Sequence, residues 1–130
     1  MASIRNESVP ALLKDRLSQR ANQMINDKFK EGLELQARAL NGHGFNYIVD
    51  VYTKWRGRYF YFIAKYRDPR ENAKEEFFEV RRTRLEYTGN QEFSLAYMRH
   101  TDKWFEVFQG LTLDESLKTI EENELFWPVD

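Results

Sequence analysis

The sequence predicts an α+β fold of two layers, in which a long N-terminal helix and a short C-terminal helix cover one face of an antiparallel meander sheet of four to five strands. Two changes of period carry this prediction. Apolar residues recur at spacings of three and four over residues 8–40, as on one face of a helix, whereas the spacing becomes two within 45–109, as in strands. A second helical pattern over 112–123 completes the order helix, sheet, helix.

The N-terminal pattern predicts one helix over residues 8–40, with Ser8 as its N-cap and Pro10 in its first turn. The Asn-Gly-His-Gly run at 41–44 is a strong stop signal. A helix of this length would extend about 50 Å, whereas a strand of ten residues extends only about 33 Å. We therefore expect the helix either to break near Gly32 or to pack its overhang on something else, with a second copy of the chain as the simplest candidate. The apolar stripe comprises Leu13, Leu17, Ala21, Met24, Ile25, Phe29, Leu33, Ala37 and Leu40.

Residues 45–67 are expected to form a hairpin. Two alternating runs, 45–55 and 58–67, flank Arg56-Gly57, which suits a two-residue loop because glycine readily adopts a positive φ. Such a loop pairs residue 55 with 58 and residue 53 with 60. One face of the hairpin is then nearly all apolar and is assigned to the core, while the other faces outward. The predicted core face comprises Tyr47, Val49, Val51, Thr53 and Trp55 with Phe60, Phe62, Ala64 and Tyr66.

Residues 77–88 and 92–100 are expected to form the third and fourth strands, joined by a three-residue loop at 89–91. The first residues of the third strand fall out of phase with its apolar face, so we expect a bulge near Arg81-Arg82. The predicted pairs are 87 with 93, 85 with 95 and 83 with 97.

The remaining elements are short. Residues 104–108 are expected to form a fifth strand, and Thr112 with Glu115 matches the capping-box pattern at the start of the last helix. The closing residues 125–128 are too apolar for a free tail, so we expect them to fold back onto the core.

Composition bounds the class of protein. The 130 residues suit a single domain over 1–130, and the absence of cysteine excludes disulfides, thiolate nucleophiles and cysteine-ligated zinc. The longest apolar run, 59–64, is far shorter than the ~18 residues of a spanning helix, and the N-terminus lacks the apolar core of a signal peptide. We therefore expect no membrane association and a cytoplasmic location.

Charge is unevenly distributed along the chain, although the net charge is only −1. Residues 54–84 carry ten Lys and Arg against five acids, whereas residues 102–130 carry eight acids against two lysines. Either the two zones neutralise each other in the fold, or the basic zone binds an anionic partner.

No catalytic or cofactor signature occurs in the sequence. There is no phosphate loop, dinucleotide fingerprint or nucleophile elbow, and His43 and His100 lack the spacing of a metal site, so we expect no cofactor and no metal. The best catalytic hypothesis uses His100 as a base with Asp102, Glu79 or Glu86 nearby. A turn residue whose ring bonds a backbone group is the favoured interpretation of His100.

The outward face of the sheet is the most informative surface. Aromatic and basic residues alternate there, as on surfaces that bind single-stranded nucleic acid and as in protein interfaces. An ordinary solvated face is the third interpretation, because tyrosine is also a good strand former. Asp50 and Glu86 lie on the same predicted face and reduce its positive charge. The candidate binding residues are Tyr52, Lys54, Tyr59, Tyr61, Lys65, Arg67, Arg82 and Arg84.

The sequence leaves the function unknown and favours three hypotheses in order. The first is a small non-enzymatic protein-interaction or regulatory domain that self-associates as a homodimer, with the long helix in the interface. The second is nucleic-acid binding through the outward sheet face. The third is a small-molecule or catalytic site in the cleft between helix and sheet.

Overall fold

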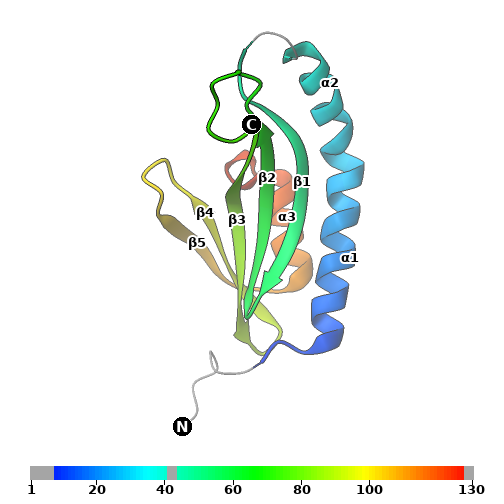
Figure 1. Cartoon of the computed structure of the whole chain (residues 1–130). Coiled ribbons are helices and arrows are strands. Elements are labelled where there is room, and N and C mark those ends of the chain that lie inside the picture. Colours follow the sequence, from blue (N-terminus) through cyan, green and yellow to red (C-terminus); the bar gives the residue numbers. More distant parts are fainter. Residues whose placement is uncertain (1–7, 41–43, 128–130) are drawn as a thin grey trace.

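The computed structural model describes residues 8–40 and 44–127 (Figure 1). It confirms the α+β class and the antiparallel meander, which has five strands in the order β1-β2-β3-β4-β5. The helices lie on one side of this sheet, so that α3 is seen behind it in Figure 1. The elements are α1 (Ala11–Lys28), α2 (Lys30–Leu40), β1 (Tyr47–Arg56), β2 (Tyr59–Arg67), β3 (Phe77–Gly89), β4 (Glu92–Met98), β5 (Trp104–Leu111), α3 (Leu113–Glu122) and the 3-10 helix η2 (Glu124–Phe126).

The long helix begins later than predicted and is interrupted earlier. Pro10, not Ser8, occupies the N-cap position, and its carbonyl accepts the first helical hydrogen bond. The interruption falls at Phe29, whose φ is −118°, and not at Gly32 three residues later. Hydrogen bonds from Phe29 N–H to Ile25 O and from Leu33 N–H to Phe29 O span this point, so α2 continues α1 in nearly the same direction (Figure 1).

The helical overhang packs on the sheet. Leu33 of α2 is buried in the same core as α1, and Lys30 forms an ion pair with Asp50 of β1 at 3.7 Å. The stop signal at 41–43 and the side chains of Ala37 and Leu40 lie outside the described residues. Leu33 therefore needs no second copy of the chain to cover it.

For the first hairpin, the predicted strands are confirmed, but the predicted register is wrong. Its turn is Gly57-Arg58 and not Arg56-Gly57, because Arg56 pairs with Tyr59. Gly57 takes the positive φ, 60°, at the first loop position, where a type II′ turn requires it. The register from Asp50 to Arg56 is consequently offset by two residues, and an offset of two returns the side chains of this stretch to the predicted face.

A bulge at Val49 changes the pairing at the end of this hairpin that lies away from the turn. Pairing passes from Asp50 with Lys65 directly to Ile48 with Tyr66, so the alternation inverts there. Ile48 is thereby buried in the core, where Tyr47 and Val49 were expected. Tyr47 instead pairs with Arg67, and its hydroxyl accepts a hydrogen bond from Arg67 Nη1 at 2.9 Å.

The second hairpin confirms the three predicted pairs, 87 with 93, 85 with 95 and 83 with 97. Gly89 pairs with Glu92, so the turn itself is Asn90-Gln91 and the expected irregularity lies at Thr88. Asn90 and Gln91 both have positive φ, at 53° and 58°. The predicted bulge is also confirmed, because pairing with β2 skips Arg82 between Thr83 and Arg81.

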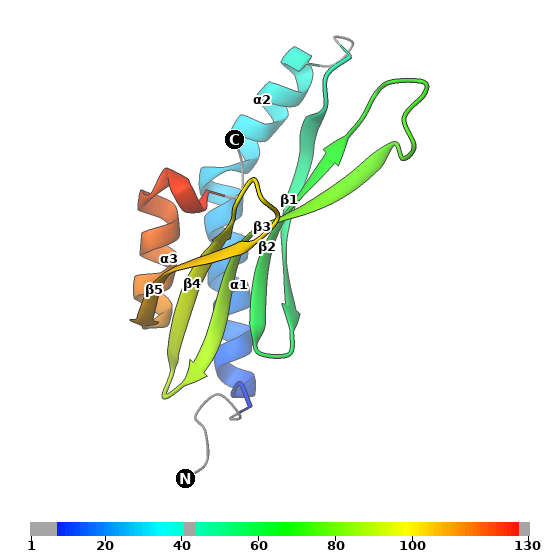
Figure 2. The same ribbon diagram turned by 90° about the vertical axis from the view of Figure 1, so that its left-hand side faces the viewer.

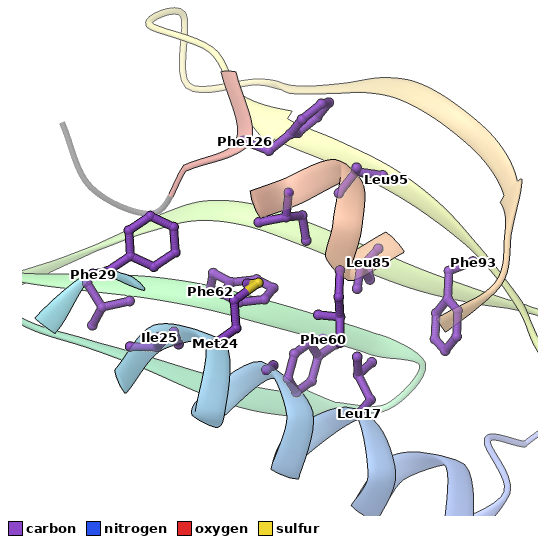
Figure 3. Packing of buried hydrophobic residues seen from close by; sticks show 14 of the residues in the cluster. Leu17, Met24, Ile25, Phe29, Phe60, Phe62, Leu85, Phe93, Leu95 and Phe126 are labelled. Atoms are coloured by element: carbon purple, nitrogen blue, oxygen red, sulfur yellow. The ribbon is translucent and has the colours of Figure 1, made fainter. Parts of the chain in front are cut away.

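The core lies between the sheet and the helices, and its side chains converge from both layers (Figure 3). The predicted capping box at the start of α3 is confirmed by reciprocal hydrogen bonds between Thr112 and Glu115. The chain then folds back as expected, so that Phe126 is buried and its carbonyl accepts a hydrogen bond from the Thr83 hydroxyl at 2.7 Å. No helix in residues 8–40 or 44–127 is long and apolar enough to cross a membrane.

Candidate binding surfaces

The sheet face opposite the helices carries no helix in the described part of the chain, and we call it the open face. Strand alternation brings seven of the eight predicted binding residues to this face. Two further residues join them that sequence reasoning missed, Arg81 of β3 and Trp104 of β5. The seven predicted residues are Tyr52, Lys54, Tyr59, Tyr61, Lys65, Arg67 and Arg84.

Arg82 does not belong to the open face. It is the bulge residue of β3, and its Nη1 donates to the Tyr66 hydroxyl at 3.3 Å, beside Trp127 on the helix side of the sheet. The bulge inverts the alternation at this point, so Arg81 takes the outward position instead. Its guanidinium lies 4.8 Å from the Tyr61 ring centroid.

Arg84 is enclosed by two aromatic rings at the centre of the open face. Its guanidinium carbon lies 4.8 Å from the Tyr59 ring centroid and 4.7 Å from that of Trp104. The Trp104 ring also lies 5.9 Å from that of Tyr61, which is only 7% exposed. Tyr61 is therefore covered by its neighbours and does not offer an open ring for stacking.

A pocket of about 240 Å³ opens beside these residues, across β1, β2 and β3. At its wall the Tyr52 hydroxyl donates a hydrogen bond to Glu79 Oε2 at 2.5 Å. This bond raises the pKa of Tyr52 to about 12, with smaller contributions from burial and from the charge of Glu79. The lining residues are Tyr52, Lys54, Arg56, Tyr61, Ile63, Glu79 and Arg81.

The outer edge of β5 is a second distinctive surface, and in the described chain β5 pairs only with β4 (Figure 2). Phe105 and Phe108 face the helix side, where Phe105 meets the ring of Tyr97 at 5.8 Å and Phe108 meets that of Phe126 at 5.9 Å. They nevertheless remain 44% and 38% exposed, and Val107 between them is 36% exposed. The described helices do not extend over this edge, which leaves it apolar and open.

Ion pairs link the described part of the acidic segment to α1. Glu121 of α3 pairs with Lys28 at 3.4 Å, and Asp114 pairs with Arg20. The ion pairs within the basic segment are local, from Arg67 to Glu76 at 3.5 Å and from Arg70 to Asp68 at 2.7 Å. In residues 8–40 and 44–127 no ion pair joins segment 54–84 to segment 102–127, and the last three residues of the acidic zone lie outside the described part of the chain.

The candidate catalytic residues are only partly brought together. His100 and Asp102 line a helix-side pocket of about 320 Å³, whereas Glu79 and Glu86 belong to the open face. Both pocket residues are exposed in a tight turn, in which Asp102 N–H bonds to the Arg99 carbonyl at 2.9 Å. Within the described chain no hydrogen bond orients the imidazole, so this arrangement lacks the positioned partner that a general base needs. His43 lies outside the described residues.

Residues 9–128 match the model of a protein family described as Domain of unknown function (DUF3024). The chain belongs to this family. No curated protein and no solved structure matches it. The matched region contains every described element from α1 to η2, so the open face, the β5 edge and the His100 pocket all lie within the DUF3024 domain. The family description assigns no activity, and the cytoplasmic location and single-domain extent stay predictions.

Proposed function

We propose that this DUF3024 protein is a non-enzymatic protein-interaction domain that self-associates as a homodimer through the edge of β5. The observation that carries the proposal is the apolar, uncovered edge formed by Phe105, Val107 and Phe108. An edge strand offers unpaired backbone N–H and C=O groups, and natural proteins usually protect such edges with charges, prolines or a covering element. Glu106 is the only charged residue between Trp104 and Leu111 and the segment contains no proline, so the protection of this edge is limited to two register shifts of β5 against β4.

A second copy of the chain fits this edge because antiparallel pairing of two identical strands is self-complementary. A two-fold axis through β5 would join the sheets of both copies and present each strand with the same hydrogen-bonding groups that it offers. Each copy would also contribute its own half-exposed phenylalanines, and fully burying a large apolar side chain contributes roughly 1.5–3 kcal/mol. The exposed Leu125 adjoins Phe126, whose ring contacts Phe108, and it extends the apolar area.

The long helix has less support as the dimer interface than it had from the sequence. Its predicted role rested on an overhang beyond the sheet, and α2 packs along β1 through Leu33 and the Lys30–Asp50 pair. Nucleic-acid binding also has less support, because Tyr61 is covered and three carboxylates, Asp50, Glu79 and Glu86, share the open face. We therefore assign self-association to β5.

Light scattering and sedimentation across a micromolar concentration series test this proposal. We expect the wild-type mass to rise from 15.7 kDa towards twice that value with concentration, and the Val107→Lys and Phe105→Lys variants to remain at 15.7 kDa. The matched control is Leu12→Lys, which places the same charge at a 72% exposed leucine on α1 and should dimerise like the wild type. Circular dichroism confirms that each variant is folded. A wild-type protein that stays at the monomer mass throughout would contradict the proposal.

A further inference from the structure

The open-face pocket combines a buried apolar floor with a cationic rim. Tyr61 and Ile63 of β2 form the floor, and both are buried although no described helix covers them. Lys54 and Arg56 of β1 are exposed, and Arg81 of β3 reaches in from the opposite side. The three strands β1, β2 and β3 thus contribute to one concave site, and Trp104 of β5 contacts its Tyr61 ring at 5.9 Å.

The cations of this pocket have no carboxylate partner. In the described part of the chain Lys54, Arg56 and Arg81 form no ion pair, whereas Arg67 and Arg70 of the same basic segment each pair with an acid. Glu79 is the one acid lining the pocket, and the Tyr52 hydroxyl already donates to it. The pocket therefore carries an excess of positive charge that the protein itself does not compensate.

Arg81 is held in place for binding. Its guanidinium lies over the Tyr61 ring at 4.8 Å, and a stacked guanidinium keeps its N–H groups free at the edges of the plane. A carboxylate or phosphate oxygen is the acceptor that matches such donors best. A cation fixed by stacking also loses less side-chain entropy when it binds a ligand.

From this geometry we propose that the pocket binds a small organic anion. Its phosphate or carboxylate contacts Lys54, Arg56 and Arg81, and its apolar part contacts the small surface that Tyr61 and Ile63 leave open to the pocket, without stacking on the Tyr61 ring. The volume of about 240 Å³ lies below the ~300–1,000 Å³ typical of pockets for drug-sized ligands. The ligand is therefore of the size of a sugar phosphate or a small aromatic acid. The three cations that would contact the ligand belong to β1 and β3 and not to β5, although Trp104 of β5 contacts the lining residue Tyr61.

Titration of the full chain by two-dimensional amide NMR tests the proposal, with inorganic phosphate, glycerol 3-phosphate and benzoate as separate probes. We expect saturable shifts at millimolar probe or below, concentrated on Tyr61, Ile63 and Glu79. Stronger binding of glycerol 3-phosphate or of benzoate distinguishes a phosphate ligand from a carboxylate ligand. Shifts that never saturate, or that spread evenly over the surface, would overturn the proposal.

Matched charge deletions complete the experiment. Arg81→Ala should weaken the best probe roughly 10- to 100-fold, the loss expected for one hydrogen bond to a charged group, and Lys54→Ala should also weaken it. Lys65→Ala is the control, because Lys65 is a cation of the same face whose ammonium lies over Phe77 at 4.8 Å and outside the pocket. Lys54 is exposed, so its variant preserves the test if Arg81→Ala unfolds. Equal affinities in Lys54→Ala, Lys65→Ala and the wild type would show that general surface charge, and not this pocket, binds the probe.

Discussion

Phenylalanines on the helix-covered face of the sheet differ in burial between β2 and β5. Phe60 and Phe62 of β2 lie opposite α1 and are fully buried, whereas Phe105 and Phe108 of β5 face the same side and remain 44% and 38% exposed (Figure 3 shows the buried pair). The difference lies in the helix layer, which covers the β2 end and stops before β5. Aromatic residues make up 15% of the chain, and this layer does not cover all of them.

The position of α3 explains why the layer stops. Its ion pairs, Lys28–Glu121 and Arg20–Asp114, join it to α1, and Leu117 and Ile120 are buried in the common core. The helix that directly follows β5 is therefore directed towards α1 and away from the β5 edge. Only η2, through Phe126, reaches back to Phe108. Two of the four exposed phenylalanines, Phe105 and Phe108, thus lie together at the β5 edge, which is why we propose that edge as the site of self-association.

The largest expected effect is loss of stability at the covered end. Replacing Phe62 with Ala should lower the free energy of unfolding by about 3–5 kcal/mol, because a large ring is removed from a closed core. Phe105→Ala should cost only about 1 kcal/mol in dilute protein, since that ring is nearly half exposed. Urea denaturation monitored by circular dichroism measures both values. Equal losses of unfolding free energy in Phe62→Ala and Phe105→Ala would contradict the inference that the helix layer covers β2 but not β5.

A smaller effect is expected where β3 holds η2 in place. The Thr83 hydroxyl is buried and donates to the Phe126 carbonyl, so Thr83→Val should cost about 1–3 kcal/mol by leaving that carbonyl without its partner. Thr88→Val is the matched control, because the Thr88 hydroxyl donates to the Glu92 carbonyl at 3.2 Å in a partly exposed turn. Its loss should be clearly smaller in the same denaturation assay. If the control costs as much as Thr83→Val, the buried bond has no special role in anchoring η2.

The smallest expected effect is a change in the pKa of Tyr52 on the open face. Glu79→Gln removes the main cause of the raised pKa of Tyr52, so that pKa should fall from about 12 towards 10.0. Because the folded-state pKa lies above the unfolded value, the protonated phenol contributes stability below about pH 10, and this contribution is lost as the pH rises from about 10 to about 12. Ultraviolet difference titration follows the phenolate directly. The Glu86→Gln control changes another carboxylate of the same face and should leave the Tyr52 transition unmoved.

The faces of the sheet were predictable because alternation is a local property. Thr53 and Phe62 share the core face although the predicted hairpin register was offset by two residues, since such an offset preserves the direction of every side chain. Leu85 and Leu95 were paired correctly because their hairpin turn is short and well marked. In both cases a few neighbouring residues carry the information.

The candidate site was predictable only in part. Arg82 was expected on the open face, but Arg82 is itself the bulge residue. The alternation of β3 is therefore inverted beyond it, and Arg81 is the residue that faces outward. Trp104 was missed because its place beside Arg84 and Tyr61 depends on the pairing of β5 with β4, and β5 lies three strands away from Tyr61 of β2 in the sheet. Contacts between distant strands leave no periodic signal in the sequence.

By itself, the sequence determined the class of fold, the order of its elements, the capping box at Thr112 and the inward or outward direction of most strand residues. Each of these follows from short-range periodicity or from hydrogen bonds within a few residues. The tertiary structure alone decided the bulge at Val49, the enclosure of Arg84 between two rings, the pocket on the open face and the uncovered edge at β5. The physical reason is that a bulge shifts the alternation by one residue, and the packing of whole layers, not the local pattern, determines where that shift occurs and which apolar side chains remain without a partner.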